Sequence, residues 1–143
     1  MQIAIGWALL ILGGLLYTAQ IISSIDFKLG QRLGIQEDPK ETDSVVQTLE
    51  RYIAFWDLLT LGWMPLAGFL MIVDHEWWPI ISLLAGAIYF DTSGREAVKN
   101  ISLRQEGFRV GSKKQKKLFF FTYIFMAIIG MTLIVYSAKV LLV

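Results

Sequence analysis

The chain has 143 residues, of which 55% are hydrophobic and only 17% are charged. This composition is too apolar for an ordinary soluble domain and the length suits one domain, so we expect a single integral membrane domain over 1–143. The absence of cysteine excludes disulfides, thiolate metal sites and cysteine nucleophiles. The formal net charge of +1 conceals a strong segregation, because most charges fall in two segments.

Two uncharged runs predict the first and the last membrane helix. The first helix is expected over about 1–25 and the last over about 118–140, because each contains at least the roughly 20 apolar residues that a crossing needs. The amino-terminal run lacks the basic start of a secretory signal and is longer than the apolar part of one. We therefore expect it to be a retained membrane helix.

The second helix is expected over about 45–73. Its apolar part contains one charge, Asp57, and one proline, Pro65, which removes a backbone donor and should kink the helix. Ser44 and Gln47 have the spacing of a capping box at the start of this helix. The helix should therefore begin in the cytoplasm and then enter the membrane.

The third helix, expected over about 77–94, has the weakest signal, because its uncharged run ends at Phe90. Its tryptophans and aliphatic residues would otherwise have no burial site, which favours a crossing. Two interpretations remain for its end. Either Ser93 and Glu96 form a second capping box that starts a separate surface helix, or the membrane helix continues through Arg95.

The basic residues predict the topology. Twelve of the 13 lysines and arginines lie between Asp26 and Arg51 or between Gly94 and Lys117. Four crossings place both segments on one side, which the positive-inside rule makes cytoplasmic. The sequence thus predicts an all-α, four-helix membrane bundle with both termini outside and charged cytoplasmic loops at about 26–44 and 95–117. In a bacterium this multi-pass protein would reside in the inner (plasma) membrane.

Two acids at membrane depth are the most informative polar residues. Asp57 lies six residues inward of Arg51, or about 9 Å, and the count from the outer turn places Asp91 at a similar depth. A carboxylate there costs about 2.5–3.5 kcal/mol and should pair, take up a proton or face a water-filled cavity. The expected pocket around these acids consists of Asp57, Asp91, Arg51, Arg95, Gln20, Trp56, Trp63 and Tyr89.

This cluster has two interpretations. It could form an inward-opening pocket for a cation or an amphipathic ligand, or a proton-handling site. Alternatively, it is a structural polar cluster that joins two helices by hydrogen bonds. Glu50 is expected to be a solvated or paired acid at the interface. The lone histidine, His75, lacks further ligands on its side of the membrane, so the sequence predicts no metal site and no cofactor.

Basic and small residues suggest contacts with lipids and with other helices. The lysines before the last helix could bind anionic headgroups or only anchor the helix; they are Lys113, Lys114, Lys116 and Lys117. Small residues allow close helix packing, within the bundle or in a homo-oligomer or larger membrane complex; they are Gly14, Thr18, Ser82, Gly86, Ala127 and Gly130. The basic patch is too short and too close to the membrane for nucleic acid.

No catalytic motif is present, so the leading functional hypothesis is non-catalytic. We expect a small polytopic protein that binds a membrane partner or a lipid-like ligand, or that serves as an accessory subunit. One alternative is a membrane-embedded enzyme or receptor that uses Asp57 and Asp91 on an amphipathic or cationic molecule. A weaker alternative is an oligomeric channel or transporter.

Overall fold

The computed structural model describes all residues from Met1 to Val143 and is entirely helical. Its helices are α1 (Gln2–Ile25), α2 (Phe27–Arg32), α3 (Ser44–Thr60), α4 (Trp63–Ile72), α5 (Trp78–Gln105) and α6 (Lys113–Leu141). The first and last predicted helices are confirmed, although α6 begins five residues early. The second and third predicted helices correspond to α3 with α4 and to the first part of α5.

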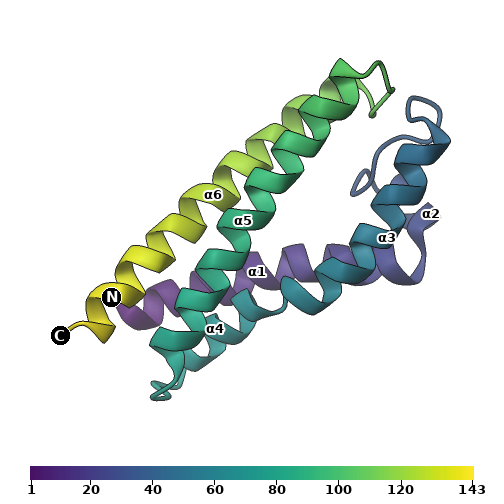
Figure 1. Ribbon diagram of the computed structural model, residues 1–143. Coiled ribbons are helices and arrows are strands. Elements are labelled where there is room, and N and C mark those ends of the chain that lie inside the picture. The colour runs from purple at the N-terminus through teal and green to yellow at the C-terminus, as the bar shows by residue number, and fades with distance from the viewer.

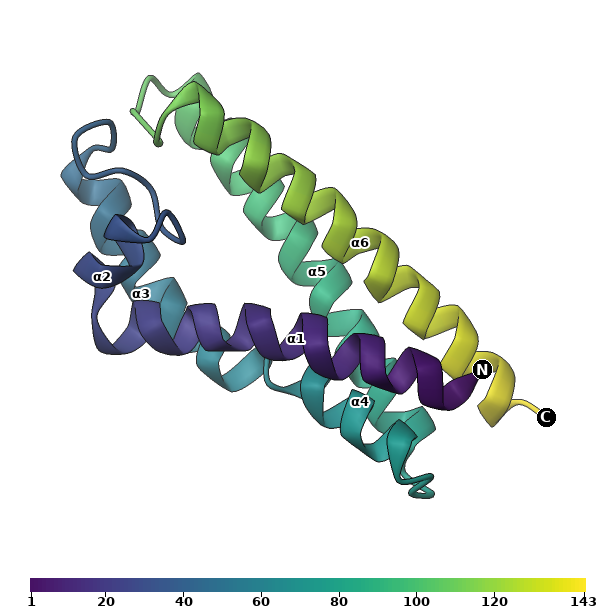
Figure 2. The same ribbon diagram turned by 180° about the vertical axis from the view of Figure 1, so that it is seen from behind.

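The helices form two groups that converge at one end of the molecule. In one group α1 packs on α3 and α4, and in the other α5 packs along α6 (Figure 1). Both termini and the turn between α4 and α5 lie at the converging end, whereas α2 and the two charged loops lie at the other (Figure 2). The groups are joined by contacts between α4 and α5 and by a shared core that includes Met64, Met71, Tyr89 and Met126.

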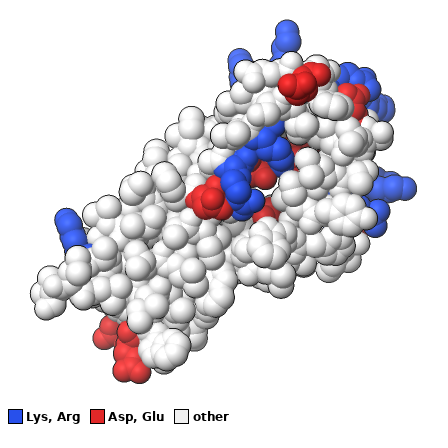
Figure 3. Space-filling model, viewed as in Figure 1, with Lys and Arg blue, Asp and Glu red and all other residues white.

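Three helical stretches are long and apolar enough to cross a membrane. They are Gln2–Ile25, the combined Ser44–Ile72 and Lys113–Leu141. The apolar part of α5 is shorter, because polar residues begin at Asp91. On the face in Figure 3 the charged side chains gather at the loop end and in a hollow between the helix groups, and they leave a wide uncharged band. The chain is thus an all-helical protein with three candidate membrane-spanning segments.

The predicted kink in the second helix is confirmed as a break between α3 and α4. Pro65 has no N–H to donate to the carbonyl oxygen of Leu61, so this oxygen loses its helical partner. The hydroxyl of Tyr89 on α5 donates a hydrogen bond of 3.3 Å to it instead. Tyr89 is completely buried, and its hydroxyl therefore links the break between α3 and α4 to α5 of the other group.

Neither predicted capping box forms. The N-cap of α3 is Asp43 rather than Ser44, and the Gln47 side chain donates to the carbonyl oxygen of Thr42 instead of completing a box. Of the two interpretations of the third helix, the continuous helix is confirmed and the separate surface helix at Ser93 is wrong, because α5 continues unbroken to Gln105. The Ser93 hydroxyl donates to Phe90 O in the preceding turn. In both cases a side chain bonds to a different backbone carbonyl group, and the spacing of the residues alone does not show which hydrogen bond forms.

A capping box does form at the start of α6. The Ser112 side chain accepts from the backbone N–H of Gln115, and the Gln115 side chain accepts from the backbone N–H of Ser112. These bonds explain why the helix starts before its apolar run. The first turns of α6 therefore carry the lysine run, whose members are all exposed: Lys113, Lys114, Lys116 and Lys117.

Glycines allow the two closest helix contacts. A Cβ atom on Gly86 of α5 would lie 2.7 Å from the carbonyl oxygen of Gly130 on α6, and one on Gly68 of α4 would lie 2.5 Å from the backbone nitrogen of Leu10 on α1. The small residues Ser82, Gly86 and Gly130 thus serve packing within the molecule. Gly14 differs, because nothing lies within 4 Å of its added Cβ.

Candidate functional site

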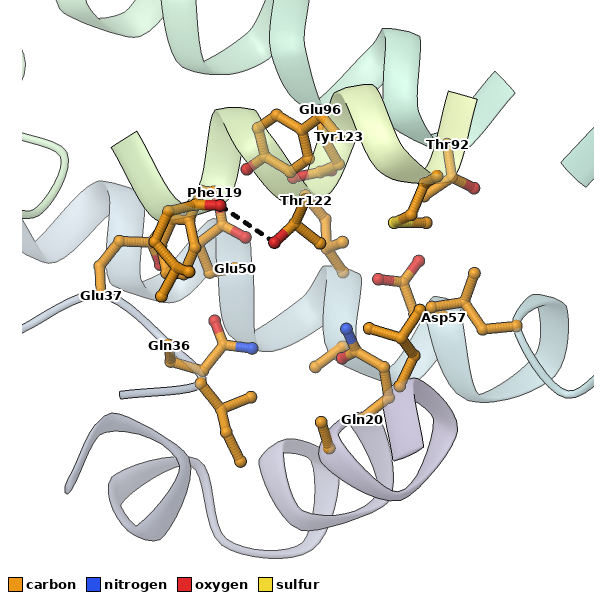
Figure 4. Close-up of a pocket in the computed structure, with 18 of the residues that line it drawn as sticks. Gln20, Gln36, Glu37, Glu50, Asp57, Thr92, Glu96, Phe119, Thr122 and Tyr123 are labelled. Carbon is orange, nitrogen blue, oxygen red and sulfur yellow. Dashed lines mark hydrogen bonds between the residues drawn. The ribbon is translucent and has the colours of Figure 1, made fainter. Parts of the chain in front are cut away.

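A partly open cavity of about 280 Å³ lies between the two helix groups, in the hollow of Figure 3. Residues from α1, α3, α5, α6 and the loop before α3 line it (Figure 4). Its polar lining consists of Gln20, Gln36, Glu37, Glu50, Asp57, Thr92, Glu96, Thr122 and Tyr123. Four of these side chains are carboxylic acids, so the cavity is acidic.

The helical repeat of α3 explains why two acids of this helix reach the cavity. Its buried face comprises Val46, Glu50, Ala54, Asp57 and then Leu61, at spacings of three or four residues. Glu50 and Asp57 are only 7% and 6% exposed. Two carboxyl groups therefore occupy the stripe that an amphipathic helix normally fills with apolar side chains.

Lys99 of α5 neutralises part of this charge. Its Nζ lies 2.6 Å from Glu50 Oε1 on α3 and 2.6 Å from Glu96 Oε2 on its own helix. The three side chains are at most 17% exposed. This arrangement is a buried ion triad that joins α3 to α5 and carries one surplus negative charge when every member is ionised.

Asp57 has no such partner. It makes no ion pair and no side-chain hydrogen bond, although it is almost completely buried and faces the cavity (Figure 4). The Gln20 side chain reaches the same cavity from α1, and its Oε1 atom is buried without a hydrogen-bond donor. Unpartnered acceptors of this kind are costly, and they suit a ligand that brings donors and positive charge.

The loop between α2 and α3 folds over the mouth of the cavity. Glu37 in this loop is 5% exposed and makes no ion pair. Burial raises the pKa of its carboxyl group above the ordinary value, although its own backbone N–H and the charges of Lys99 and Arg104 oppose the shift. Glu37 thus adds a second carboxyl group that lacks a direct counter-charge.

Hydrogen bonds to the second loop hold the first loop in place. The Gln115 side chain bridges the backbone of Gln36 and Asp38, and the backbone N–H of Gly111 donates to Thr42. Each of these residues lies more than sixty positions from its partner in the sequence. The first loop is therefore held by the second loop and by the first turn of α6.

An ion pair between Asp43 and Arg109 also joins the two loops. The Asp43 carboxylate accepts hydrogen bonds of 2.9 Å from the backbone N–H and from Nε of Arg109. The backbone and side-chain donors of Arg109 lower the pKa of Asp43. A lowered pKa means that the pair contributes stability above the ordinary aspartate pKa and loses it as the pH falls through the lowered value.

Of the predicted pocket residues, the structure places Asp57 and Gln20 in the cavity wall. Asp91 does not line the cavity: its side chain is 65% exposed and binds Arg95 at 2.6 Å. Its neighbour Thr92 lines the cavity instead. The two aspartates therefore share no cavity in which they could act as an acid and a base together.

The remaining predicted residues also lie outside the cavity lining. Arg51 and Trp56 are exposed on the outer face of α3, and Trp63 packs partly buried against the core. Tyr89 is buried, and its hydroxyl is committed to Leu61. Their expected binding role remains a prediction that this geometry does not favour.

The sequence did not reveal Glu37, Glu96 and Tyr123 as members of the cavity lining, and Glu50 was expected outside it. It also did not reveal Lys99 as the ion-pair partner of Glu50 and Glu96. Only Glu50 could have been found, because it lies two helical turns before Asp57 and so shares its face. Glu96 lies one turn after Thr92, which the sequence had not placed in the pocket. Glu37 carried no signal, because a loop position gives no information about a fold across the bundle.

The acids do not form a metal site. No group of three or more histidine, aspartate or glutamate side chains is arranged to hold a metal ion. No protein-family model matches the sequence, and no curated protein or solved structure is significantly similar to the chain.

Proposed function

We propose that this protein is a non-catalytic, multi-pass membrane protein that binds a small organic cation in its acidic cavity. The observation that carries the proposal is the Asp57 side chain, which is 6% exposed and has no ionic or hydrogen-bond partner. A charged carboxylate at membrane depth costs about 2.5–3.5 kcal/mol unless it is compensated. A bound cation would compensate it.

The lining favours an amine with a short apolar body. Apolar side chains from α1, α3 and α6 share the cavity with the acids, among them Leu16, Ile53, Phe119 and Met126. The volume of about 280 Å³ is near the lower end of ligand cavities, roughly 300–1,000 Å³. A bulky lipid would not fit, so we propose a small cationic amphiphile, held by a receptor-like protein or by an accessory subunit of a membrane complex.

We further propose four crossings, with the cavity mouth and both charged loops on the cytoplasmic side. Support comes from α5, which packs along α6, and from the position of both termini at the end opposite the loops (Figure 1). The basic residues of both loops favour the cytoplasm. Reporter fusions to the two termini should both be active only outside the cytoplasm, and reporters in opposite compartments would contradict this topology.

Replacement of Asp57 by asparagine should abolish most of the affinity for an amine. A suitable probe is n-hexylamine, which is protonated at neutral pH. A hydrogen-bonded charge pair contributes about 1.5–3 kcal/mol, so we expect the dissociation constant for Asp57→Asn to rise at least tenfold. The measurement is calorimetric titration of the protein in nanodiscs, with empty nanodiscs as the blank.

The matched control is Asp91→Asn. Asp91 is also a membrane-level aspartate, but it lies on the outer face of α5 in an exposed pair with Arg95. We expect this variant to bind n-hexylamine as the wild type does. Equal affinity of the wild type and Asp57→Asn, or no binding by the wild type, would refute the proposed cation site.

A further inference from the structure

The carboxyl groups of the cavity form two poles rather than one cluster. Glu50 and Asp57 lie seven residues apart on the same face of α3, which corresponds to about 10 Å along the helix axis. In Figure 4, Asp57 lies at one end of the cavity and Glu37 with Glu50 at the other. Between the two acids of α3, Ile53 and Ala54 line the wall. The cavity therefore has acidic groups at each end and a partly apolar wall between them.

At each pole the carboxyl groups outnumber the cationic groups that pair with them. At the end of the cavity away from its mouth, Asp57 has no partner, and Gln20 offers a further oxygen without a hydrogen-bond donor. At the mouth, the carboxyl groups of Glu37, Glu50 and Glu96 face a single ammonium group, that of Lys99. The nearby Arg104 is bound to Asn100 and to the carbonyl oxygen of Val110, so it does not pair with Glu37.

A single ammonium group can reach only one of these poles. An ammonium-to-carboxylate hydrogen bond is about 2.7–2.9 Å long, and Glu50 and Asp57 lie about 10 Å apart along α3, so a ligand that satisfies both poles needs two cationic groups roughly 5–10 Å apart. The apolar side chains of the cavity wall suit a methylene chain between these groups. Resting on the proposed cation site, we propose that the natural ligand class is a linear aliphatic diamine, with one ammonium at Asp57 and the other near Glu37.

The test compares three amines on the wild-type protein in nanodiscs of neutral lipid. Hexamethylenediamine has both charges and sufficient length, n-hexylamine has the length but one charge, and ethylenediamine has two amino groups but is too short. Calorimetric titration should give hexamethylenediamine an affinity on the order of tenfold or more above that of either other amine. Equal affinity of hexamethylenediamine and n-hexylamine would overturn the diamine assignment while leaving the cation site supported.

Two variants locate the ammonium groups. Glu37→Gln should weaken the binding of hexamethylenediamine more than that of n-hexylamine and so remove most of the difference in affinity between them. Asp57→Asn should weaken the binding of both amines. Asp91→Asn is the control and should keep the wild-type order of affinities. A preference that survives in Glu37→Gln would contradict the proposed position of the second ammonium. Failure of all three amines to bind the folded wild-type protein would overturn both the diamine assignment and the cation site.

Discussion

Replacement of Lys99 by methionine is expected to destabilise the protein by about 3–5 kcal/mol, because it leaves buried carboxylates without their counter-charge. Glu50 and Glu96 each lie 2.6 Å from the Lys99 ammonium and are less than 15% exposed. Methionine keeps the apolar stem but removes the charge, so the loss should be electrostatic. The measurement is denaturant unfolding in detergent micelles, followed by tryptophan fluorescence.

Arg95→Met provides a control on the same helix. Arg95 also pairs with an acid one turn away, Asp91, but both side chains are about half exposed or more. Exposed pairs of this kind contribute about 0.3–0.5 kcal/mol. Adding Glu50→Gln and Glu96→Gln to Lys99→Met should restore much of the stability, because the triad is then neutral. A loss in Lys99→Met no larger than that in Arg95→Met would show that the triad does not stabilise the fold.

The second large effect is expected at the contact between α1 and α4. In Gly68→Ala the new Cβ would lie 2.5 Å from Leu10 N and 2.6 Å from Gly6 O. Both obstacles are backbone atoms, which cannot rotate away, so the two helices must separate. Such overpacking costs typically about 1–3 kcal/mol, and we expect a loss near 3 kcal/mol in the same unfolding assay.

Gly14→Ala tests whether the loss at Gly68 comes from helix contact or from the substitution itself. Gly14 is also a helical glycine, but nothing lies within 4 Å of its added Cβ. Alanine favours the helix by up to about 1 kcal/mol, so this variant should be neutral or slightly more stable. A neutral Gly68→Ala would mean that α1 and α4 do not approach as closely as described.

The features that could be predicted from sequence are those set by distance along the chain. Uncharged runs located α1 and α6, and Pro65 marked the break between α3 and α4. Asp57 stood out as the single charge in an apolar stretch, and the structure places this side chain in the cavity. These features depend on local chemistry and on the rise per residue, both of which the sequence contains.

The direction in which a side chain points around its helix was harder to predict. Asp91 and Thr92 lie at nearly the same depth, but one residue turns the helix by about 100° and moves the side chain from the outer face to the cavity. Which face is buried depends on the neighbouring helix. For the same reason the triad of Lys99 with Glu50, and the loop that brings Glu37 to the mouth, depend on contacts between distant segments.

The proposed function requires that the Asp57 carboxylate pairs with the cation of a bound amine. Solid-state NMR of the protein in lipid, with isotope labels in the aspartate carboxyl carbons and in the nitrogen of n-hexylamine, would measure this contact directly. We expect a dipolar coupling that corresponds to a hydrogen bond of about 2.7–2.9 Å and that disappears in Asp57→Asn. A bound amine without measurable coupling to Asp57 would contradict this pairing.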